Sequence, residues 1–321
     1  MPDPKVPRHT PNPTPNPTPN PTPNPTPNPA PSPAPTRAPT PPSGATSDTP
    51  RDPGAILPDR LPAPFTPPAG FLDAARALGV EFEPGETERL GAYLALLDAA
   101  NQSMNLTAVR DPDAAWTRHI LDSLSLLPML AELDEGSRVI DVGSGGGLPG
   151  IPLAICMPNL RFTLLESTGK KAAFLSRAVD LLGLKNTSVV ADRSERYARW
   201  RESAKFAPKG SSPSGRGTFD AVLARAVGRL PLLLELTVPL AKLHGRVLLI
   251  KGEKAEEELA EAAGALRALK AVHAATIPTP TGRVVVIEKP SETPRVYPRP
   301  DGEPSRRPLG VVAPPAGGRP R

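Results

Sequence analysis

The chain has 321 residues, a formal net charge of +5, one cysteine and four histidines. A single cysteine excludes a disulfide within the chain, and the scattered histidines show no metal-ligand spacing, so we expect no metal site. Because no apolar run reaches the length of about 18 residues needed for a membrane span, and no signal peptide is visible, we expect a cytoplasmic protein without a membrane partner.

Composition divides the chain into segments. Residues 1–68 hold 26 of the 47 prolines, many in tandem PNPT units, and this predicts an extended, disordered arm because little apolar surface offsets the ordering entropy. Residues 69–133 are predicted to form an N-terminal helical cap and residues 134–290 the principal domain. Within that domain, residues 203–218 are rich in Gly, Ser, Pro and Lys and are predicted to be a flexible insertion. Residues 291–321 are expected to be a basic tail rich in Pro and Arg.

The cap is predicted to contain three helices. Apolar residues recur at helical spacing over residues 70–78, 85–102 and 114–130. His119 and Asp122 are three residues apart on the third of these helices, so they share a face. His119 is there either a satisfied histidine at a helix–sheet contact or a group on the substrate side.

Strands and helices then alternate, which is typical of a parallel sheet covered by helices on both faces. The expected strands are residues 138–142, 161–165, 187–190, 220–223 and 246–250. The expected helices are residues 148–157, 170–182, 230–241 and 255–270. Two last strands near residues 274–277 and 284–288 are joined by so short a turn that they must be antiparallel.

The most informative stretch is a glycine-rich turn after the first expected strand, where residues 139–152 read VIDVGSGGGLPGIP. A Cβ atom would block close approach of the backbone to a ligand, so glycines here indicate a binding site. Gly145, Gly147 and Gly150 match the dinucleotide fingerprint, whereas Gly143, Gly145 and Gly147 match a spacing common in methyltransferases that use S-adenosylmethionine (SAM). A tight turn that binds nothing is disfavoured by five glycines in eight positions.

Charged residues are expected at the carboxyl ends of the strands, where open α/β sheets bind their ligands. Glu166 ends the second strand, 23 residues beyond Gly143, and can accept hydrogen bonds from ribose hydroxyls. Residues 191–195 follow the third strand, beside the place expected for an adenine. Arg225 and Lys251 follow the fourth and fifth strands.

Basic side chains are concentrated near these strand ends. Residues 185–229 hold ten basic and four acidic residues. This excess suggests an anionic partner such as nucleic acid, although a solvated arginine-rich surface accounts for the charge equally well.

Several separate motifs resemble the RsmG (GidB) family, which uses SAM to methylate N7 of a guanine in 16S rRNA. They are NLTAVR at residues 105–110, RHILDS at 118–123, DVGSGGGLPGIP at 141–152, LIKG at 249–252 and the tail from 297 to 309. The resemblance implies an α/β, class I SAM-dependent methyltransferase. Its Rossmann-like, mostly parallel seven-stranded sheet would end in a C-terminal antiparallel hairpin and carry an N-terminal helical cap. It also implies 16S rRNA of the small ribosomal subunit as the partner, and we expect a monomer.

The resemblance also implies the residues of the site. The expected cofactor-binding residues are Gly143, Gly145, Leu148, Glu166, Ser194, Glu195 and Arg225. Guanine N7 has a free lone pair, so methyl transfer needs no general base and depends on positioning. Arg and Lys suit guanine O6 and phosphates, and we expect three of them to position the substrate. These are Arg193, Arg225 and Lys251, with His119 as a weaker candidate.

The basic tail is expected to contact RNA phosphates through Arg295, Arg299, Arg306 and Arg307.

Three other functions compete with methylation of 16S rRNA. The main alternative is a methyltransferase of the same fold acting on another RNA, a protein or a small molecule. An NAD-dependent oxidoreductase is disfavoured by the final antiparallel hairpin and the spacing of Gly143, Gly145 and Gly147. A non-catalytic RNA-binding scaffold is disfavoured because every expected cofactor position is present.

Overall fold

The computed structural model describes residues 60–199 and 214–311. Residues 1–59, which make up most of the expected arm, lie outside the described residues. So do most of the expected insertion and residues 312–321. Phe65, which the composition places in the arm, donates its backbone N–H to the Gly91 carbonyl at 3.2 Å, so this part of the segment packs on the cap. Within the described ranges, no helix combines the length and apolar character needed to cross a membrane.

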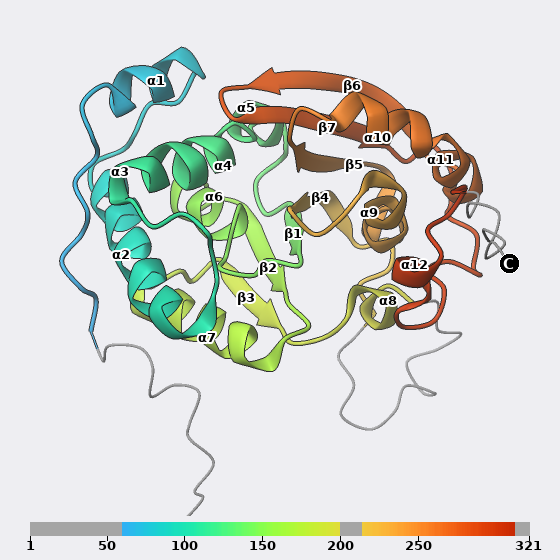
Figure 1. Ribbon diagram of the computed structural model, residues 1–321, viewed down its shortest axis with the longest axis horizontal. Coiled ribbons are helices and arrows are strands. Elements are labelled where there is room, and N and C mark those ends of the chain that lie inside the picture. The colour runs from blue at the N-terminus through green and yellow to red at the C-terminus, as the bar shows by residue number, and fades with distance from the viewer. Residues whose placement is uncertain (1–59, 200–213, 312–321) are drawn as a thin grey trace, which may run out of the picture. The chain divides into compact units, whose positions relative to one another are not determined.

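One seven-stranded sheet organises the fold, with strand order β3-β2-β1-β4-β5-β7-β6 (Figure 1). The strands are β1 (Arg138–Val142), β2 (Arg161–Leu165), β3 (Thr187–Val190), β4 (Phe219–Arg225), β5 (Ala241–Lys251), β6 (Val272–Thr279) and β7 (Gly282–Glu288). Strands β1 to β5 pair in parallel, whereas β7 pairs antiparallel with both β5 and β6. The mostly parallel sheet with a C-terminal antiparallel hairpin is therefore confirmed.

The strand order reverses beside β1. The chain runs outward from β1 to β2 and β3, and then returns to place β4 on the other side of β1. At such a switch point the loops after β1 and β4 diverge, and ligands bind in the crevice at the carboxyl ends of the strands. The glycine turn directly follows β1, and Arg225 is the last residue of β4, so both lie at this edge.

Alternate residues of each strand pack into different cores, because successive side chains in a strand point to opposite faces. Val139 and Phe162 pack with helices on one face, whereas Ile140 and Leu165 pack with helices on the other. The first group of helices includes α1 (Phe71–Ala77), α2 (Glu86–Met104), α6 (Gly150–Cys156) and α7 (Gly169–Leu181). The second includes α9 (Leu230–Thr237), α10 (Ala255–Glu261) and α11 (Ala263–Leu269), and Figure 1 shows the two groups on opposite sides of the sheet.

The third helix of the cap is interrupted, so the prediction of one continuous helix over residues 114–130 is wrong. This segment contains α3 (Pro112–Ala115), the π-helical turn η2 (Trp116–Leu121), α4 (Asp122–Leu124) and α5 (Leu127–Leu130). Ser123 and Ser125 donate their hydroxyls back to the carbonyls of His119 and Asp122, and such bonds bend helices. A π-helical turn is also frequent at functional sites.

The helix predicted over residues 230–241 is too long. Helix α9 ends at Thr237 because Pro239 brings no backbone N–H to continue it. A 3₁₀ turn, η4 (Val238–Leu240), follows, and Ala241 already belongs to β5.

Other boundaries also differ. The helix predicted over residues 255–270 is divided at Ala262 into α10 and α11. Strands β4 and β5 extend further than predicted, so Arg225 and Lys251 are the last residues of their strands rather than the residues after them. The sequence patterns do not predict the short helices α8 (Ser194–Tyr197) and α12 (Glu303–Arg306).

The chain beyond β7 packs against α9. The backbone N–H and the guanidinium of Arg299 donate to the fully buried Glu235 carboxylate at 2.6–3.1 Å. Arg216 donates to the carbonyls of Thr293 and Tyr297 at 2.6 and 2.5 Å. The Arg299 guanidinium is thus engaged within the protein, and its expected contact with RNA phosphates stays a prediction.

Candidate active site

The glycine turn after β1 is shaped for close approach of a ligand. Gly143 and Gly145 have φ angles of +71° and +55°, which side-chain-bearing residues rarely adopt. A Cβ atom on Gly143 would lie 2.7 Å from the Val227 side chain, so glycine there allows the turn to pack against the loop after β4. A Cβ atom on Gly145 would meet only the Gly143 carbonyl oxygen, at 3.8 Å, so this position is open.

Glu166, the residue after β2, fixes the glycine turn. One carboxylate oxygen accepts the Gly145 N–H at 3.0 Å, and the other accepts the Thr168 N–H at 2.7 Å. Each carboxylate oxygen has a further lone pair after these bonds, and these are the acceptors that a ribose diol needs. The buried carboxylate therefore orients the turn and presents an acceptor to the cavity beside it.

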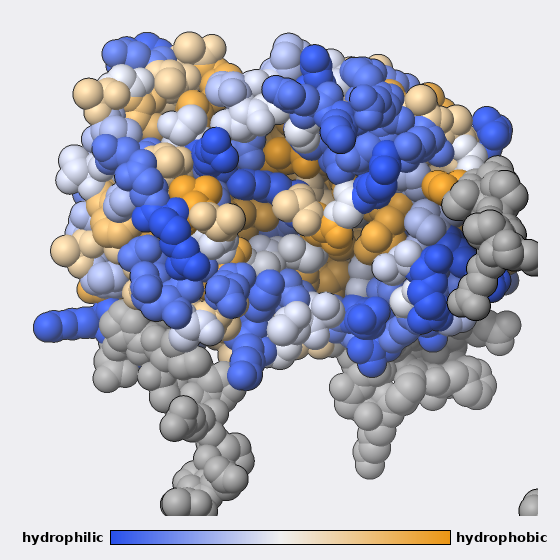
Figure 2. Space-filling view, in the orientation of Figure 1, coloured by the Kyte–Doolittle hydropathy of each residue, from blue (hydrophilic) through white to orange (hydrophobic). Residues whose placement is uncertain are grey.

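This cavity, which we call the glycine-turn cavity, has a volume of about 550 Å³. It brings together five of the seven expected cofactor-binding residues: Gly143, Gly145, Leu148, Glu166 and Arg225. His119 and the 106–109 loop also line it. In the orientation of Figure 1, Figure 2 shows a recessed, partly hydrophobic area near β1 and β4, with hydrophilic side chains around it. Cavities of this size and mixed lining suit small organic ligands.

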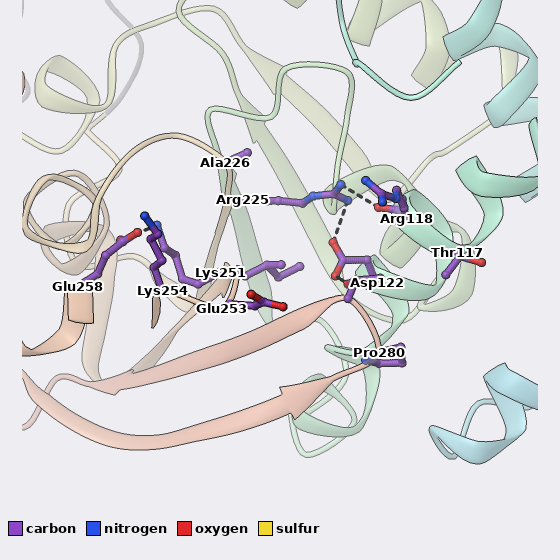
Figure 3. A pocket seen from close by; sticks show the side chains of 13 residues that line it. Thr117, Arg118, Asp122, Arg225, Ala226, Lys251, Glu253, Lys254, Glu258 and Pro280 are labelled. Carbon is purple, nitrogen blue, oxygen red and sulfur yellow. Dashed lines mark hydrogen bonds and ion pairs between the residues drawn. The ribbon is translucent and has the colours of Figure 1, made fainter. Parts of the chain in front are cut away.

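A second, neighbouring cavity of about 790 Å³ is lined mainly by charged groups, and we call it the charged cavity (Figure 3). Its basic residues are Arg118, Arg225, Lys251 and Lys254, and its acidic residues are Asp122, Glu253 and Glu258. Arg118, Arg225 and Ala226 line both cavities. The boundary between the two spaces thus lies at the end of β4.

Arg225 is held at this boundary by the cap. Its guanidinium forms an ion pair with Asp122 at 3.1 Å and donates to the Arg118 carbonyl at 2.8 Å. It also contacts His119 Nδ1 at 3.3 Å. Figure 3 shows Arg225 pointing away from Lys251 and toward Arg118 and Asp122. The shared face predicted for His119 and Asp122 is therefore confirmed, and Arg225 is what this face contacts.

His119 is neutral at physiological pH. Burial, with a smaller effect from the Arg225 charge, lowers its pKa to about 4. Since Arg225 donates to Nδ1, the ring proton lies on Nε2, which donates to Thr107 Oγ1 at 2.8 Å. Thr107 also accepts the Val109 N–H at 3.0 Å, so the network reaches the loop of the first family motif.

Lys251 lines the charged cavity but is engaged by protein groups. Its ammonium donates to the Gly228 carbonyl at 2.7 Å and pairs with Glu258 at 2.7 Å, and its side chain is 9% exposed. Glu258 in turn accepts the Leu230 N–H at 2.9 Å. In this arrangement Lys251 fixes the loop between β4 and α9, and its role as a substrate-positioning residue stays a prediction.

The remaining expected residues lie apart from Arg225. Arg193, Ser194 and Glu195 line neither of the two cavities as formed by the described residues. The Ser194 hydroxyl donates to the Leu236 carbonyl at 2.5 Å, and Glu195 accepts the Gly302 N–H at 2.9 Å. Arg193 pairs with Glu195 at 3.5 Å. The structure therefore does not bring Arg193 together with Arg225 and Lys251, and roles for these three residues in binding stay predictions.

Sequence reasoning did not select two buried groups behind the glycine turn. Asp141 lies in the apolar strand β1, one residue before its end, and accepts the Gly150 N–H at 3.1 Å, and burial raises its pKa to about 7. The Tyr93 hydroxyl donates to the Gly146 carbonyl at 2.9 Å. An acid inside an apolar strand is a visible signal for Asp141, whereas Tyr93 is 53 residues from Gly146 and gives none.

The fold and the site together define a class I SAM-dependent methyltransferase. SAM carries a ribose, which fits the Glu166 carboxylate, and it lacks a pyrophosphate that a helix N-terminus would need to bind. The open position at Gly145 leaves room for close backbone contact. The residues that line the glycine-turn cavity are therefore suited to bind SAM.

The chain belongs to the rRNA small subunit methyltransferase G family. The family model described as "GidB: rRNA small subunit methyltransferase G" matches residues 86–282. Among similar proteins, Ribosomal RNA small subunit methyltransferase G of Sorangium cellulosum (strain So ce56) is 49% identical over 78% of this chain and 99% of its own length. The proteins of the same name from Roseiflexus sp. (strain RS-1) and Rubrobacter xylanophilus are 40% and 41% identical. They match 74% and 73% of this chain, and 98% and 87% of their own lengths.

Proposed function

We propose that this protein transfers the methyl group of SAM to N7 of a specific guanine in 16S rRNA of the small ribosomal subunit. The observation that carries the proposal is the pair of cavities that meet at Arg225, one fitting SAM and the other lined by charged groups. The guanine would enter the charged cavity with N7 toward the shared boundary. Family membership supports rRNA as the substrate class.

The residues of this chain would act mainly by positioning. Bound SAM supplies a methyl group that its sulfonium charge already activates. Guanine N7 has a free lone pair, so the neutral His119 and the paired Arg225 and Asp122 have no proton to remove. Their role would be to fix the boundary so that N7 lies in line with the methyl group. Because Asp122 balances the Arg225 charge, the boundary does not repel a cationic donor or a cationic methylated base.

The charged cavity also suits a base that is turned out of its stack. Enzymes that modify a base act on single-stranded substrate or extrude the base into a pocket, and RNA loops present such splayed bases. Arg118 and Lys254 line this cavity and would contact the phosphates or O6 of the guanine. With an rRNA substrate we propose that the protein acts in the cytoplasm, as a monomer.

The test is methyl transfer from labelled SAM to small ribosomal subunits that lack the modification, with the product nucleoside identified by chromatography. We expect labelled 7-methylguanosine at one position of 16S rRNA. If SAM binds but subunits and free rRNA stay unlabelled, the substrate is another RNA, a protein or a small molecule, and the proposal fails. A molar mass in solution of twice 33.8 kDa would contradict the monomer.

A further inference from the structure

Three segments far apart in the chain meet around one carboxylate beside the charged cavity. Asp122 belongs to the cap, Arg225 ends β4, and Thr281 lies in the turn between β6 and β7. The Arg225 guanidinium pairs with one Asp122 oxygen at 3.1 Å, and the Thr281 hydroxyl donates to the other. We propose that Asp122 and Thr281 are positioning residues for methyl transfer, which hold the Arg225 guanidinium at the boundary between the two cavities. This inference rests on the proposed function.

The location of the cluster separates it from an ordinary buried ion pair. Asp122, Arg225 and Thr281 all line the charged cavity, and Arg225 lines the glycine-turn cavity as well. A small rotation of the guanidinium would therefore change the shape of both spaces at once. The Asp122 side chain is 6% exposed and that of Arg225 is 18% exposed, so water competes little for these bonds.

Close packing against the end of β5 fixes the position of the hairpin turn that carries Thr281. A Cβ atom on Gly282 would lie 2.2 Å from the Lys251 carbonyl oxygen, so only glycine lets the turn pack this closely against the end of β5. Pro280, on the other side of Thr281, lines the charged cavity (Figure 3). The antiparallel hairpin thus closes one wall of this cavity and brings a hydroxyl to Asp122.

In the described part of the chain, the side-chain partners of Arg225 come from the cap: the Asp122 carboxylate, the Arg118 carbonyl and His119 Nδ1. Of these, only Asp122 supplies a full negative charge, and Thr281 orients that charge without contacting Arg225. We infer an order of action in which Thr281 orients Asp122, Asp122 orients Arg225, and Arg225 sets the boundary.

The experiment compares Thr281→Val, Asp122→Asn and the double variant. For each, the Kd for SAM, the kcat and KM for methylation of unmodified small subunits, and the melting temperature are measured. A misplacement of about 1 Å at a reacting centre costs on the order of 100-fold in rate. We therefore expect kcat at saturating SAM to fall by about 10- to 100-fold for Asp122→Asn, and by a smaller factor for Thr281→Val.

The double variant distinguishes positioning from simple stabilisation. If Thr281 acts through Asp122, the double variant is no slower than Asp122→Asn alone. We expect Thr281→Val to raise the Kd for SAM by a smaller factor than it lowers kcat, since Thr281 does not itself line the glycine-turn cavity and acts on it only through Arg225. Unchanged kcat in Thr281→Val, or independent multiplication of the two single effects, would overturn the inference, even if Asp122→Asn failed to fold.

Two matched controls come from the same elements. Asp220→Asn removes a carboxylate that pairs with Lys242 at 2.7 Å at the opposite end of β4, and Thr276→Val removes a hydroxyl bonded to His273 within the hairpin. Both are expected to lower the melting temperature without changing kcat. The wild-type protein, assayed in parallel, separates the two proposals. If it does not methylate the subunit, the proposed function fails, whereas an active wild type with unaffected variants refutes only this inference.

Discussion

At the scale of the residue, Gly145 shows what the glycine turn is for. Its φ is +55°, and an added Cβ would meet only the Gly143 carbonyl oxygen at 3.8 Å, so a methyl group would project into the glycine-turn cavity. Gly183, after α7, has a similar φ of +63°, and an added Cβ there meets nothing within 4 Å. The two positions share the backbone strain but differ in whether the methyl group would meet a ligand.

Gly145→Ala is therefore expected to weaken SAM binding, whereas Gly183→Ala is not. Both variants should lose about 1–2 kcal/mol of unfolding free energy from the left-handed backbone. Overpacking costs about 1–3 kcal/mol, which corresponds to a rise of about 5- to 150-fold in the Kd of Gly145→Ala for SAM. Calorimetric titration with SAM and urea unfolding measure the two effects. Equal SAM affinities in the two variants would show that no ligand approaches Gly145.

At the scale of the element, the chain after β7 is attached to α9 by a buried ion pair. Glu235 lies in the middle of the apolar helix α9 and has no exposed surface, and Arg299 supplies its charge partner. The Arg229–Glu261 pair joins α9 and α10 at the surface, where its side chains are 61% and 43% exposed. A buried carboxylate without its partner keeps its full desolvation cost, whereas an exposed one is solvated by water.

Arg299→Ala should accordingly lower the unfolding free energy by about 3–5 kcal/mol. Arg229→Ala should lower it by no more than about 1 kcal/mol. Urea unfolding of both variants measures the difference. The double variant Arg299→Met/Glu235→Leu should recover most of the loss, because no uncompensated charge is left buried. If Arg299→Ala also lowers the unfolding free energy by no more than about 1 kcal/mol, the chain after β7 contributes little to the fold.

At the scale of the whole molecule, two buried groups make stability depend on pH in opposite directions. The pKa of His119 is lowered to about 4, so between pH 4 and 6.5 the unfolded chain binds the extra proton and stability falls as the pH falls. The pKa of Asp141 is raised to about 7, so between pH 3.8 and 7 the folded protein binds the extra proton and stability falls as the pH rises. Over most of this range the two contributions oppose each other.

His119→Gln removes one of these contributions. The loss of unfolding free energy caused by this substitution should be greatest near pH 7 and should shrink as the pH falls toward 4. The change amounts to at most about 1.4 kcal/mol per pH unit. Urea unfolding of the wild-type and variant proteins at several pH values between 4.5 and 7 tests this. A difference in stability that stays constant over the range would show that His119 titrates normally in the folded protein.

The sequence by itself determined the local elements and the glycine site. Strands β1, β2 and β3 begin and end at the predicted residues, because apolar runs bounded by turn residues depend only on neighbours in the chain. The same local patterns put Gly143, Gly145 and Glu166 just after strand ends, and in the structure these three residues line one cavity. The interruption of the cap helix at η2 was missed, because apolar periodicity does not register one extra residue in a helical turn.

Only the tertiary structure decided which partner each charged side chain found. Arg225 and Lys251 follow the same pattern at strand ends, yet Arg225 is held at the boundary of two cavities and Lys251 is engaged by Gly228 and Glu258. Arg193 lies apart from both. Asp122 lies about a hundred positions before Arg225, and a pair so distant in the chain depends on how elements pack in three dimensions, which the local spacing of residues does not show.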